Sequence, residues 1–228
     1  MAKKRVRLRD RILPSYTKGE EIFNMVTHIV GGAVGIATLV FCILIPAFRG
    51  SVRGILCGIA FGVSMIALYA MSSIYHGLRP NLAKKVFQVM DHCTIYFLIA
   101  GTYTPILLCN LAKTYPVEAW VTFGVLWGLV ALATTLTAID LAKYKLFSMI
   151  CYVGLGWAVI PTIHKVYECL GFWGFMLVLG GGILYTLGVV FFQVGKKIKY
   201  FHSIFHIFVL LGSICHSLAV MFFVLWRV

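Results

Sequence analysis

The stretch Lys199–His216, KYFHSIFHIFVLLGSICH, combines an apolar run with two closely spaced histidines. It begins with charge and places His202 and His206 at the start of the apolar run. On a helix, residues i and i+4 lie on one face, so both imidazoles can point to one spot, as metal ligands do. In a soluble helix such a pair is more often coincidental. In a membrane helix polar groups are costly and usually face the interior of a bundle, so the setting decides what the pair means.

The composition is that of a membrane protein. Mean hydropathy is +0.95, 61% of the residues are hydrophobic and 12% are charged, against the roughly 25% charged residues usual in soluble domains. Seven stretches lack Asp, Glu, Lys and Arg, and each can cross a hydrocarbon layer that needs about 20 residues. They are Ile22–Phe48, Gly54–His76, His92–Ala112, Ala119–Ile139, Leu146–His164, Cys169–Gly195 and Tyr200–Trp226. The sequence predicts an all-α integral membrane protein, a bundle of seven transmembrane helices.

The distribution of positive charge predicts the orientation. If the seven spans alternate, fifteen of the 20 Lys and Arg residues fall on the side of the N-terminus and five on the other. The positive-inside rule then places the N-terminus in the cytoplasm and the C-terminus outside. We expect residues 1–21 to be a basic cytoplasmic tail near anionic lipid head groups, with no cleavable signal peptide, and residues 22–228 to be one membrane domain. The net charge of +13 does not indicate nucleic-acid binding, because the positive residues lie at the ends of spans.

This topology brings several polar residues to one depth. The second span ends on the cytoplasmic side at His76, where Asp91 precedes the third span and His202 and His206 begin the seventh. His28 and His92 share this leaflet, while Glu21 and Asn24 either cap the site or form a solvated helix start. His164 is expected at the outer surface. His216 lies ten residues beyond His206, about 15 Å along a helix, so we expect it to pack or to form an interhelical hydrogen bond.

Three imidazoles at one depth predict a metal site. His76, His202 and His206 suit Zn²⁺, which commonly takes three protein ligands in hydrolytic sites and leaves one position for water. Asp91 would hold the attacking water without binding the metal, and Ser72, one turn from His76, would orient that water or polarise a substrate. Another metal is not excluded. The alternative is an interior cluster of hydrogen-bonded polar groups that pins the helices together.

These motifs resemble those of a known superfamily. S-x-x-x-H at Ser72–His76, the aspartate of DHCTIYFLIAGTYTP at Asp91, and H-x-x-x-H at His202–His206 are similar to the signature of the PAQR superfamily, which includes the bacterial hemolysin III proteins. The short basic N-terminus, EEIFNMVTH and GTYTP resemble the hemolysin III branch most closely. The resemblance implies a seven-helix bundle in a bacterial inner membrane. It also implies Zn²⁺ held by His76, His202 and His206, and links with ceramide and other lipid-amide hydrolysis and with membrane lipid homeostasis.

Three functions follow as hypotheses. The first is a zinc-dependent lipid amide or ester hydrolase with Asp91 as general base, and the second is a non-catalytic zinc-containing sensor or receptor. The third is a pore-forming haemolysin, which the clustered rather than lined-up polar residues do not favour. Membrane lipids are the expected partners, as substrate or as sensed ligand. The sequence names neither the lipid nor a protein partner.

Overall fold

The computed structural model describes residues 6–195 and 197–228, and its elements are all helical. Three long helices come first, α1 (Lys18–Phe48), α2 (Val52–Gly77) and α3 (Leu82–Pro105). The π-helical turn η2 (Ile106–Leu111) and α4 (Ala112–Thr114) extend α3, and α5 (Pro116–Ile139) follows. Then come α6 (Lys145–Gly156), η3 (Ile160–Thr162), α7 (Ile163–Val194) and α8 (Phe201–Ala219), which η4 (Val220–Val224) and η5 (Leu225–Arg227) complete. The short η1 (Leu8–Asp10) precedes them all.

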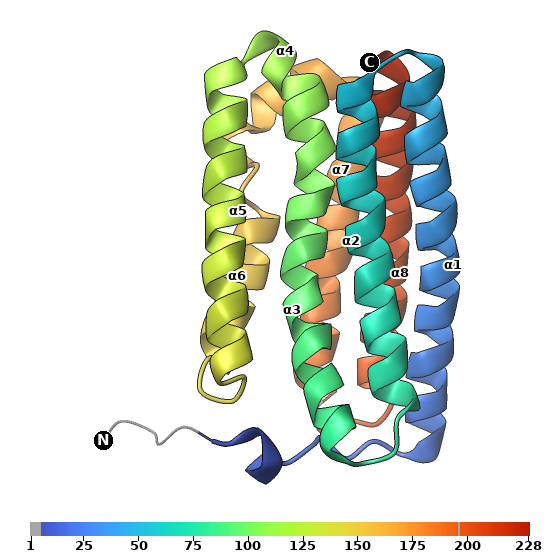
Figure 1. Cartoon of the computed structure of the whole chain (residues 1–228), viewed down its shortest axis with the longest axis vertical. Coiled ribbons are helices and arrows are strands. Elements are labelled where there is room, and N and C mark those ends of the chain that lie inside the picture. Colours follow the sequence, from blue (N-terminus) through green and yellow to red (C-terminus); the bar gives the residue numbers. More distant parts are fainter. Residues whose placement is uncertain (1–5, 196) are drawn as a thin grey trace.

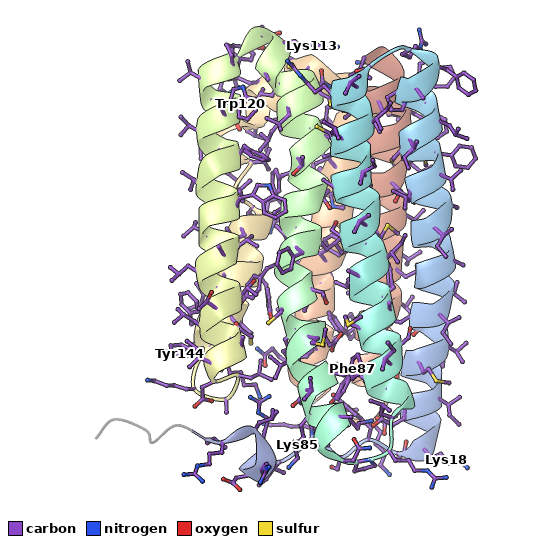
Figure 2. The ribbon with its side chains drawn as sticks, viewed as in Figure 1. Lys18, Lys85, Phe87, Lys113, Trp120 and Tyr144 are labelled. Atoms are coloured by element: carbon purple, nitrogen blue, oxygen red, sulfur yellow. The ribbon has the colours of Figure 1, made fainter. Side chains whose placement is uncertain are left out.

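The long helices run along one axis, and the two chain ends lie at opposite ends of the bundle (Figure 1). α1 packs against α2 and α8, α2 against α3, and α7 against α8. Lys18 and Lys85 lie at the end that carries the N-terminus, and Lys113 lies at the opposite end (Figure 2). Charged side chains therefore mark both ends of a largely apolar bundle.

Six helical segments of the described chain are long and apolar enough to cross a membrane. The expected fifth span and all but the last residue of the expected sixth fall within one of them, the 50-residue segment Lys145–Val194. α6 has 12 residues, about 18 Å at 1.5 Å per residue, and Pro161 in η3 follows it. A second break lies inside α7 at Gly171, whose φ of 73° favours glycine. The helical prediction is confirmed, while the count of seven crossings stays a prediction.

Side-chain caps fix where the first three long helices begin. Thr17 and Glu20 form a reciprocal capping box at the start of α1, in which Thr17 Oγ1 accepts from the Glu20 amide at 3.2 Å. Ser51 caps α2, and Asn81 caps α3 by accepting from the Lys84 amide at 2.8 Å. Glu20 also accepts from the Tyr200 amide at 2.7 Å, which ties the start of α1 to the start of α8.

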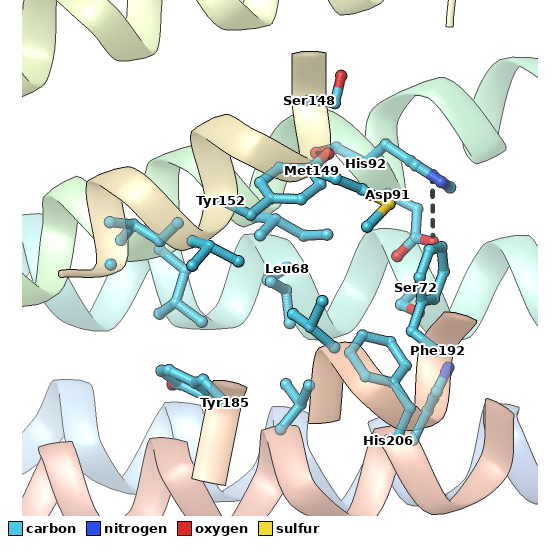
Figure 3. Close-up of a pocket in the computed structure, with 18 of the residues that line it drawn as sticks. Leu68, Ser72, Asp91, His92, Ser148, Met149, Tyr152, Tyr185, Phe192 and His206 are labelled. Carbon is cyan, nitrogen blue, oxygen red and sulfur yellow. Dashed lines mark hydrogen bonds and ion pairs between the residues drawn. The ribbon is translucent and has the colours of Figure 1, made fainter. Parts of the chain in front are cut away.

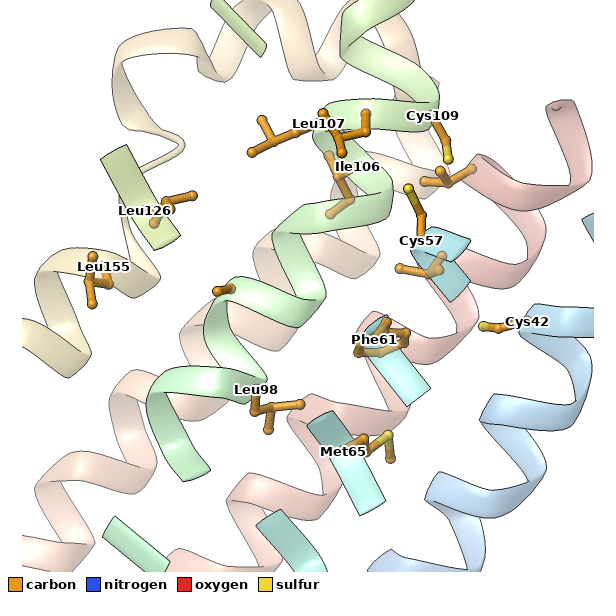
Figure 4. Packing of buried hydrophobic residues seen from close by; sticks show 14 of the residues in the cluster. Cys42, Cys57, Phe61, Met65, Leu98, Ile106, Leu107, Cys109, Leu126 and Leu155 are labelled. Carbon is orange, nitrogen blue, oxygen red and sulfur yellow. The ribbon is translucent and has the colours of Figure 1, made fainter. Parts of the chain in front are cut away.

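The apolar core takes buried residues from all the long helices, α1, α2, α3, α5, α7 and α8, and from α6. Phe61 and Met65 of α2 are fully buried and face Leu98 and Ile106 of the α3 side (Figure 4). The seven cysteines are all free. Buried polar residues lie at the end of the bundle that carries the N-terminus, among them His76 and His206, and also farther along it, among them Ser213 and His216.

The described part of the basic tail lies along that end of the bundle. The Val6 amide donates to Asp140 Oδ2 at 3.1 Å, which links the segment to the turn between α5 and α6. Lys85 donates to the Arg9 carbonyl from the start of α3. Lys3, Lys4 and Arg5 of the expected tail lie outside the described residues.

Candidate metal centre

The structure brings His76, His202 and His206 together in the interior of the bundle. His76 lies in the last turn of α2, and the other two lie one turn apart at the start of α8. All three are buried, and one ligand atom from each lies within 4.8 Å of the others. His202 Nε2 and His206 Nε2 are 3.0 Å apart. One cluster forms because His202 and His206 share a face of α8 and the end of α2 brings His76 beside them.

The three histidines could hold a metal ion, and the spacing of His202 and His206 suits zinc. Metal–nitrogen bonds of roughly 2.0–2.1 Å in a tetrahedral site place neighbouring ligand nitrogens about 3.3 Å apart, close to the distance between His202 and His206. His76 Nε2 is buried and has no hydrogen-bond partner among the described residues. A buried polar nitrogen without a partner is costly, so its lone pair is available to a cation.

Glu21 holds the His76 ring in place. The His76 Nδ1 group lies 2.7 Å from Glu21 Oε2, and Lys84 Nζ donates to Glu21 Oε1 at 2.7 Å. Lys84 is itself buried and also donates to the Leu78 carbonyl at 2.9 Å. A carboxylate that accepts from one imidazole nitrogen leaves the other free for a metal and fixes the tautomer and ring orientation. Sequence reasoning left Glu21 undecided and missed Lys84, which approaches only in three dimensions.

Two other α1 residues, His28 and Asn24, also lie against the start of α8. The His28 ring packs on His206 with centroids 3.9 Å apart, and neither His28 nitrogen has a hydrogen-bond partner in the described chain. Asn24 Oδ1 accepts from Ser203 Oγ at 2.7 Å. Both residues are buried, so the first turns of α1 cap the site rather than forming a solvated helix start.

Asp91 and Ser72 lie on the other side of the cluster and line a cavity. They point into it at the same end as His206 (Figure 3). Ser72 is buried, whereas the Asp91 side chain is 17% exposed. The Asp91 carboxylate lies 3.9 Å from His92 Nδ1, beyond hydrogen-bond length, and that nitrogen is 2.8 Å from the Gln88 carbonyl. Asp91 therefore keeps a carboxylate that is open to the cavity.

The cavity has a volume of about 750 Å³ and is mainly apolar. It extends from His202 and His206 between α3, α6 and α7 to Tyr185 and His216. The segment from Arg11 to Tyr16 lines its end beside the cluster. Such a space suits a hydrocarbon chain with a polar group at the histidines.

Tyr16 covers the cluster from the side of the N-terminal segment. Its ring stacks on His202 with centroids 4.9 Å apart and an angle of 21°. Burial, reinforced by the carboxylates of Asp91, Glu21 and Glu20, raises the pKa of Tyr16 above its ordinary value. The phenol therefore stays neutral beside the imidazoles.

Of the remaining histidines, His164 and His216 lie apart from the cluster. His164 is exposed near the start of α7. His216 is buried on α8 and packs on Tyr185 with ring centroids 5.3 Å apart. His92 and His28 line the cavity, whereas His76 does not.

Comparison with known proteins identifies the family. The family model described as Haemolysin-III related matches residues 16–217. The chain is 36% identical to Hemolysin-3 of Bacillus cereus over 90% of its own length and 92% of that protein. It is 37% identical to the Hemolysin-3 homolog of Bacillus subtilis (strain 168) over 91% of its own length and 96% of that protein.

A more distant similarity extends to eukaryotic proteins. The adiponectin receptor protein of Drosophila melanogaster is 22% identical over 91% of this chain and 51% of that protein. No solved structure matches. The chain therefore belongs to the haemolysin III family and has more distant relatives of the PAQR type.

Proposed function

We propose that this polytopic membrane protein is a zinc-dependent hydrolase of membrane lipid amides or esters that acts in lipid homeostasis. One observation carries the proposal: three buried imidazoles meet beside an apolar cavity, which His202 and His206 line together with Asp91 and Ser72. A structural polar cluster would need neither an open carboxylate nor a cavity with room for an acyl chain.

Each residue has a distinct task in the proposed reaction. His76, His202 and His206 would hold Zn²⁺, which supplies Lewis acidity that polarises a carbonyl and lowers the pKa of water. Asp91 accepts a proton as water adds to the lipid carbonyl, and Ser72 donates a hydrogen bond that orients the carbonyl. The carbon–nitrogen or carbon–oxygen bond then breaks, and Asp91 returns its proton to the leaving amine or alkoxide.

The apolar cavity has its own part in the reaction. Its aliphatic and aromatic lining would take the hydrocarbon chain and keep bulk water from the reacting carbonyl. A substrate that reaches the site from within the bilayer would have to be a membrane lipid, which makes lipids the expected partners.

We further propose seven crossings of a bacterial inner membrane, with the N-terminus cytoplasmic and the C-terminus outside. The Lys and Arg asymmetry, the chain ends at opposite ends of the bundle, and the break at Gly171 support this arrangement. Reporter fusions at both termini test it. A periplasm-dependent reporter that is active at the N-terminus would contradict the orientation.

Turnover of a lipid panel by purified, zinc-loaded protein tests the hydrolase. We expect release of fatty acid from an amide or ester lipid by the wild type and by His164→Ala, and none by His202→Ala. Zinc binding without turnover of any lipid would favour a sensor instead. Size-selective release of dyes from liposomes would favour a pore.

The same site can be tested in cells by lipidomics. A deletion strain and a strain that carries His202→Ala should show the same change in lipid composition. If only the deletion changes the lipids, the histidine cluster is not the working part of the protein.

A further inference from the structure

The end of the cavity away from the histidine cluster carries a second polar group. His216 lies on α8, ten residues beyond His206, which is about 15 Å along the helix. Its side chain lines the cavity although the residue is only 7% exposed. The ring lies against Gly181 of α7, where an added Cβ would be 2.6 Å from His216 Nε2. The glycine thus makes room for an imidazole in the middle of the bundle.

The His216 imidazole is not satisfied by the protein. Its Nδ1 atom is buried and has no hydrogen-bond partner among the described residues. Polar groups at this depth are costly without a partner, and those in membrane helices usually face a cavity or another polar group. An imidazole that served only to fill space would be better replaced by an aromatic hydrocarbon.

Tyr185 adds a second polar atom at the same place. Its hydroxyl lies 2.8 Å from Ser213 Oγ, and Ser213 Oγ also accepts from the Tyr69 hydroxyl at 2.8 Å. Either hydroxyl of the Tyr185–Ser213 pair can donate to the other. When Ser213 donates, the Tyr185 proton is free for a partner in the cavity, which Tyr185 lines (Figure 3). Val178, Leu179 and Gly182 of the same helix, which also line the cavity, are apolar. The neighbouring Thr186 hydroxyl is already paired, because it donates to the Gly182 carbonyl and accepts from Trp157 Nε1.

We propose that His216 and Tyr185 form a second polar subsite, which binds a hydroxyl group on the hydrocarbon chain of a lipid in the cavity. A neutral imidazole has one donor and one acceptor, and a hydroxyl can pair with either because it both donates and accepts. A carbonyl could pair only with a donor. The separation from His206 places this hydroxyl along the chain and not beside the lipid head group. The inference rests on the proposed function only in assigning the polar end of the lipid to the histidine cluster.

The subsite is tested by binding to the zinc-loaded protein, without any turnover. The two probes are a fatty acid with a mid-chain hydroxyl and the unsubstituted fatty acid of the same length, each measured by isothermal titration calorimetry in detergent. We expect the wild type to bind the hydroxylated acid roughly fivefold more tightly, the usual effect of one hydrogen bond. His216→Phe should lose this preference, bind the unsubstituted acid as the wild type does, and keep its zinc.

Tyr185→Phe is the second variant and should reduce the preference while retaining the ring that packs on His216. It decides the matter if His216→Phe does not fold. Equal affinities in the wild type, no binding of either acid, or a full preference in the folded variants would overturn the subsite. A protein that prefers the hydroxylated acid but hydrolyses nothing would contradict the proposed hydrolase alone. A protein that hydrolyses lipids without this preference would contradict the subsite alone.

Discussion

Glu21 on α1 and Asp91 on α3 flank the same three histidines, but their surroundings differ. Glu21 makes two contacts of 2.7 Å, one with a candidate metal ligand, His76, and one with buried Lys84. The Asp91 carboxylate has no contact this short within the described chain, and its neighbour His92 is 3.9 Å away. One carboxylate is held by α2 and α3, and the other faces a cavity.

The difference suggests that Glu21 positions a metal ligand and that Asp91 takes part in the reaction. A carboxylate that bonds a ligand imidazole on one oxygen and an ammonium group on the other fixes the position of the ligand. A general base must instead reach a proton in the reacting complex, and Asp91 has the freedom to do so. We therefore expect substitution of Glu21 to weaken metal binding and substitution of Asp91 to reduce hydrolysis.

Removal of a histidine ligand should have the largest effect, because the roles of Glu21 and Asp91 both depend on the histidines. His206→Ala should lose most of the bound zinc and with it all hydrolysis. Elemental analysis of the purified variant measures this, with His164→Ala as the control that keeps its zinc. Undiminished zinc in His206→Ala would contradict the ligand assignment.

Asp91→Asn should separate zinc binding from activity. We expect zinc content and melting temperature close to wild type and a loss of hydrolysis of about 100- to 10,000-fold. If Asp91 only bonded a neighbouring helix, the near-isosteric amide would cost about 1 kcal/mol of stability and leave activity intact. Zinc content, melting temperature and hydrolysis, measured on one preparation, distinguish a general base from an interhelical hydrogen-bond partner. Hydrolysis at the wild-type rate would contradict the general-base role.

Glu21→Gln should show the opposite pattern, with zinc affinity lowered about 10- to 100-fold, as for other carboxylates behind a ligand histidine. The amide can no longer accept from His76 with full negative charge, so the ring is held less firmly. Competition with a zinc chelator measures the affinity, and Glu168→Gln, on an exposed residue that bonds Tyr115, is the matched control. Unchanged affinity in Glu21→Gln would remove the distinction between the two carboxylates.

Tyr16→Ala should have the smallest effect on the site. Aromatic stacking contributes about 0.5–1.5 kcal/mol, so we expect zinc to leave a few-fold faster once His202 loses its cover. Tyr16→Phe keeps the ring and should release zinc at the wild-type rate. Stopped-flow mixing with a chromogenic chelator measures both, and equal rates in Tyr16→Ala and wild type would show that Tyr16 does not protect the cluster.

The sequence predicts the helices better than the breaks between them. The absence of charge marks where a helix can cross a membrane, and Ile22–Phe48 falls wholly within α1. It does not mark where the backbone turns inside an apolar run. The run Leu146–His164 is therefore divided among α6, η3 and the start of α7, and Gly171 interrupts α7.

The sequence also predicts the histidine cluster better than it predicts Glu21 and Lys84, which hold His76 in place. Helical spacing gives the pairing of His202 with His206, and alternating spans give the depth that they share with His76. Glu21 and Lys84 come together from α1 and α3 through tertiary packing, which no local pattern encodes. Depth also separates His216 from the cluster, but it does not reveal that one cavity reaches both.

The N-terminal segment makes the start of the chain a part of the site. Burial opposes ionisation of Asp140, but the amides of Lys143, Val6 and Ala142 outweigh it and hold the pKa of Asp140 below its usual range. The link to Val6 therefore persists at neutral pH, with Tyr16 seated over His202. A shortened chain that began after Tyr16 would keep α1 to α8 but lose η1 and the part of the cavity lining that Arg11 to Tyr16 supply. A later translation start or a protease cut after Tyr16 would therefore change the cavity beside the histidines.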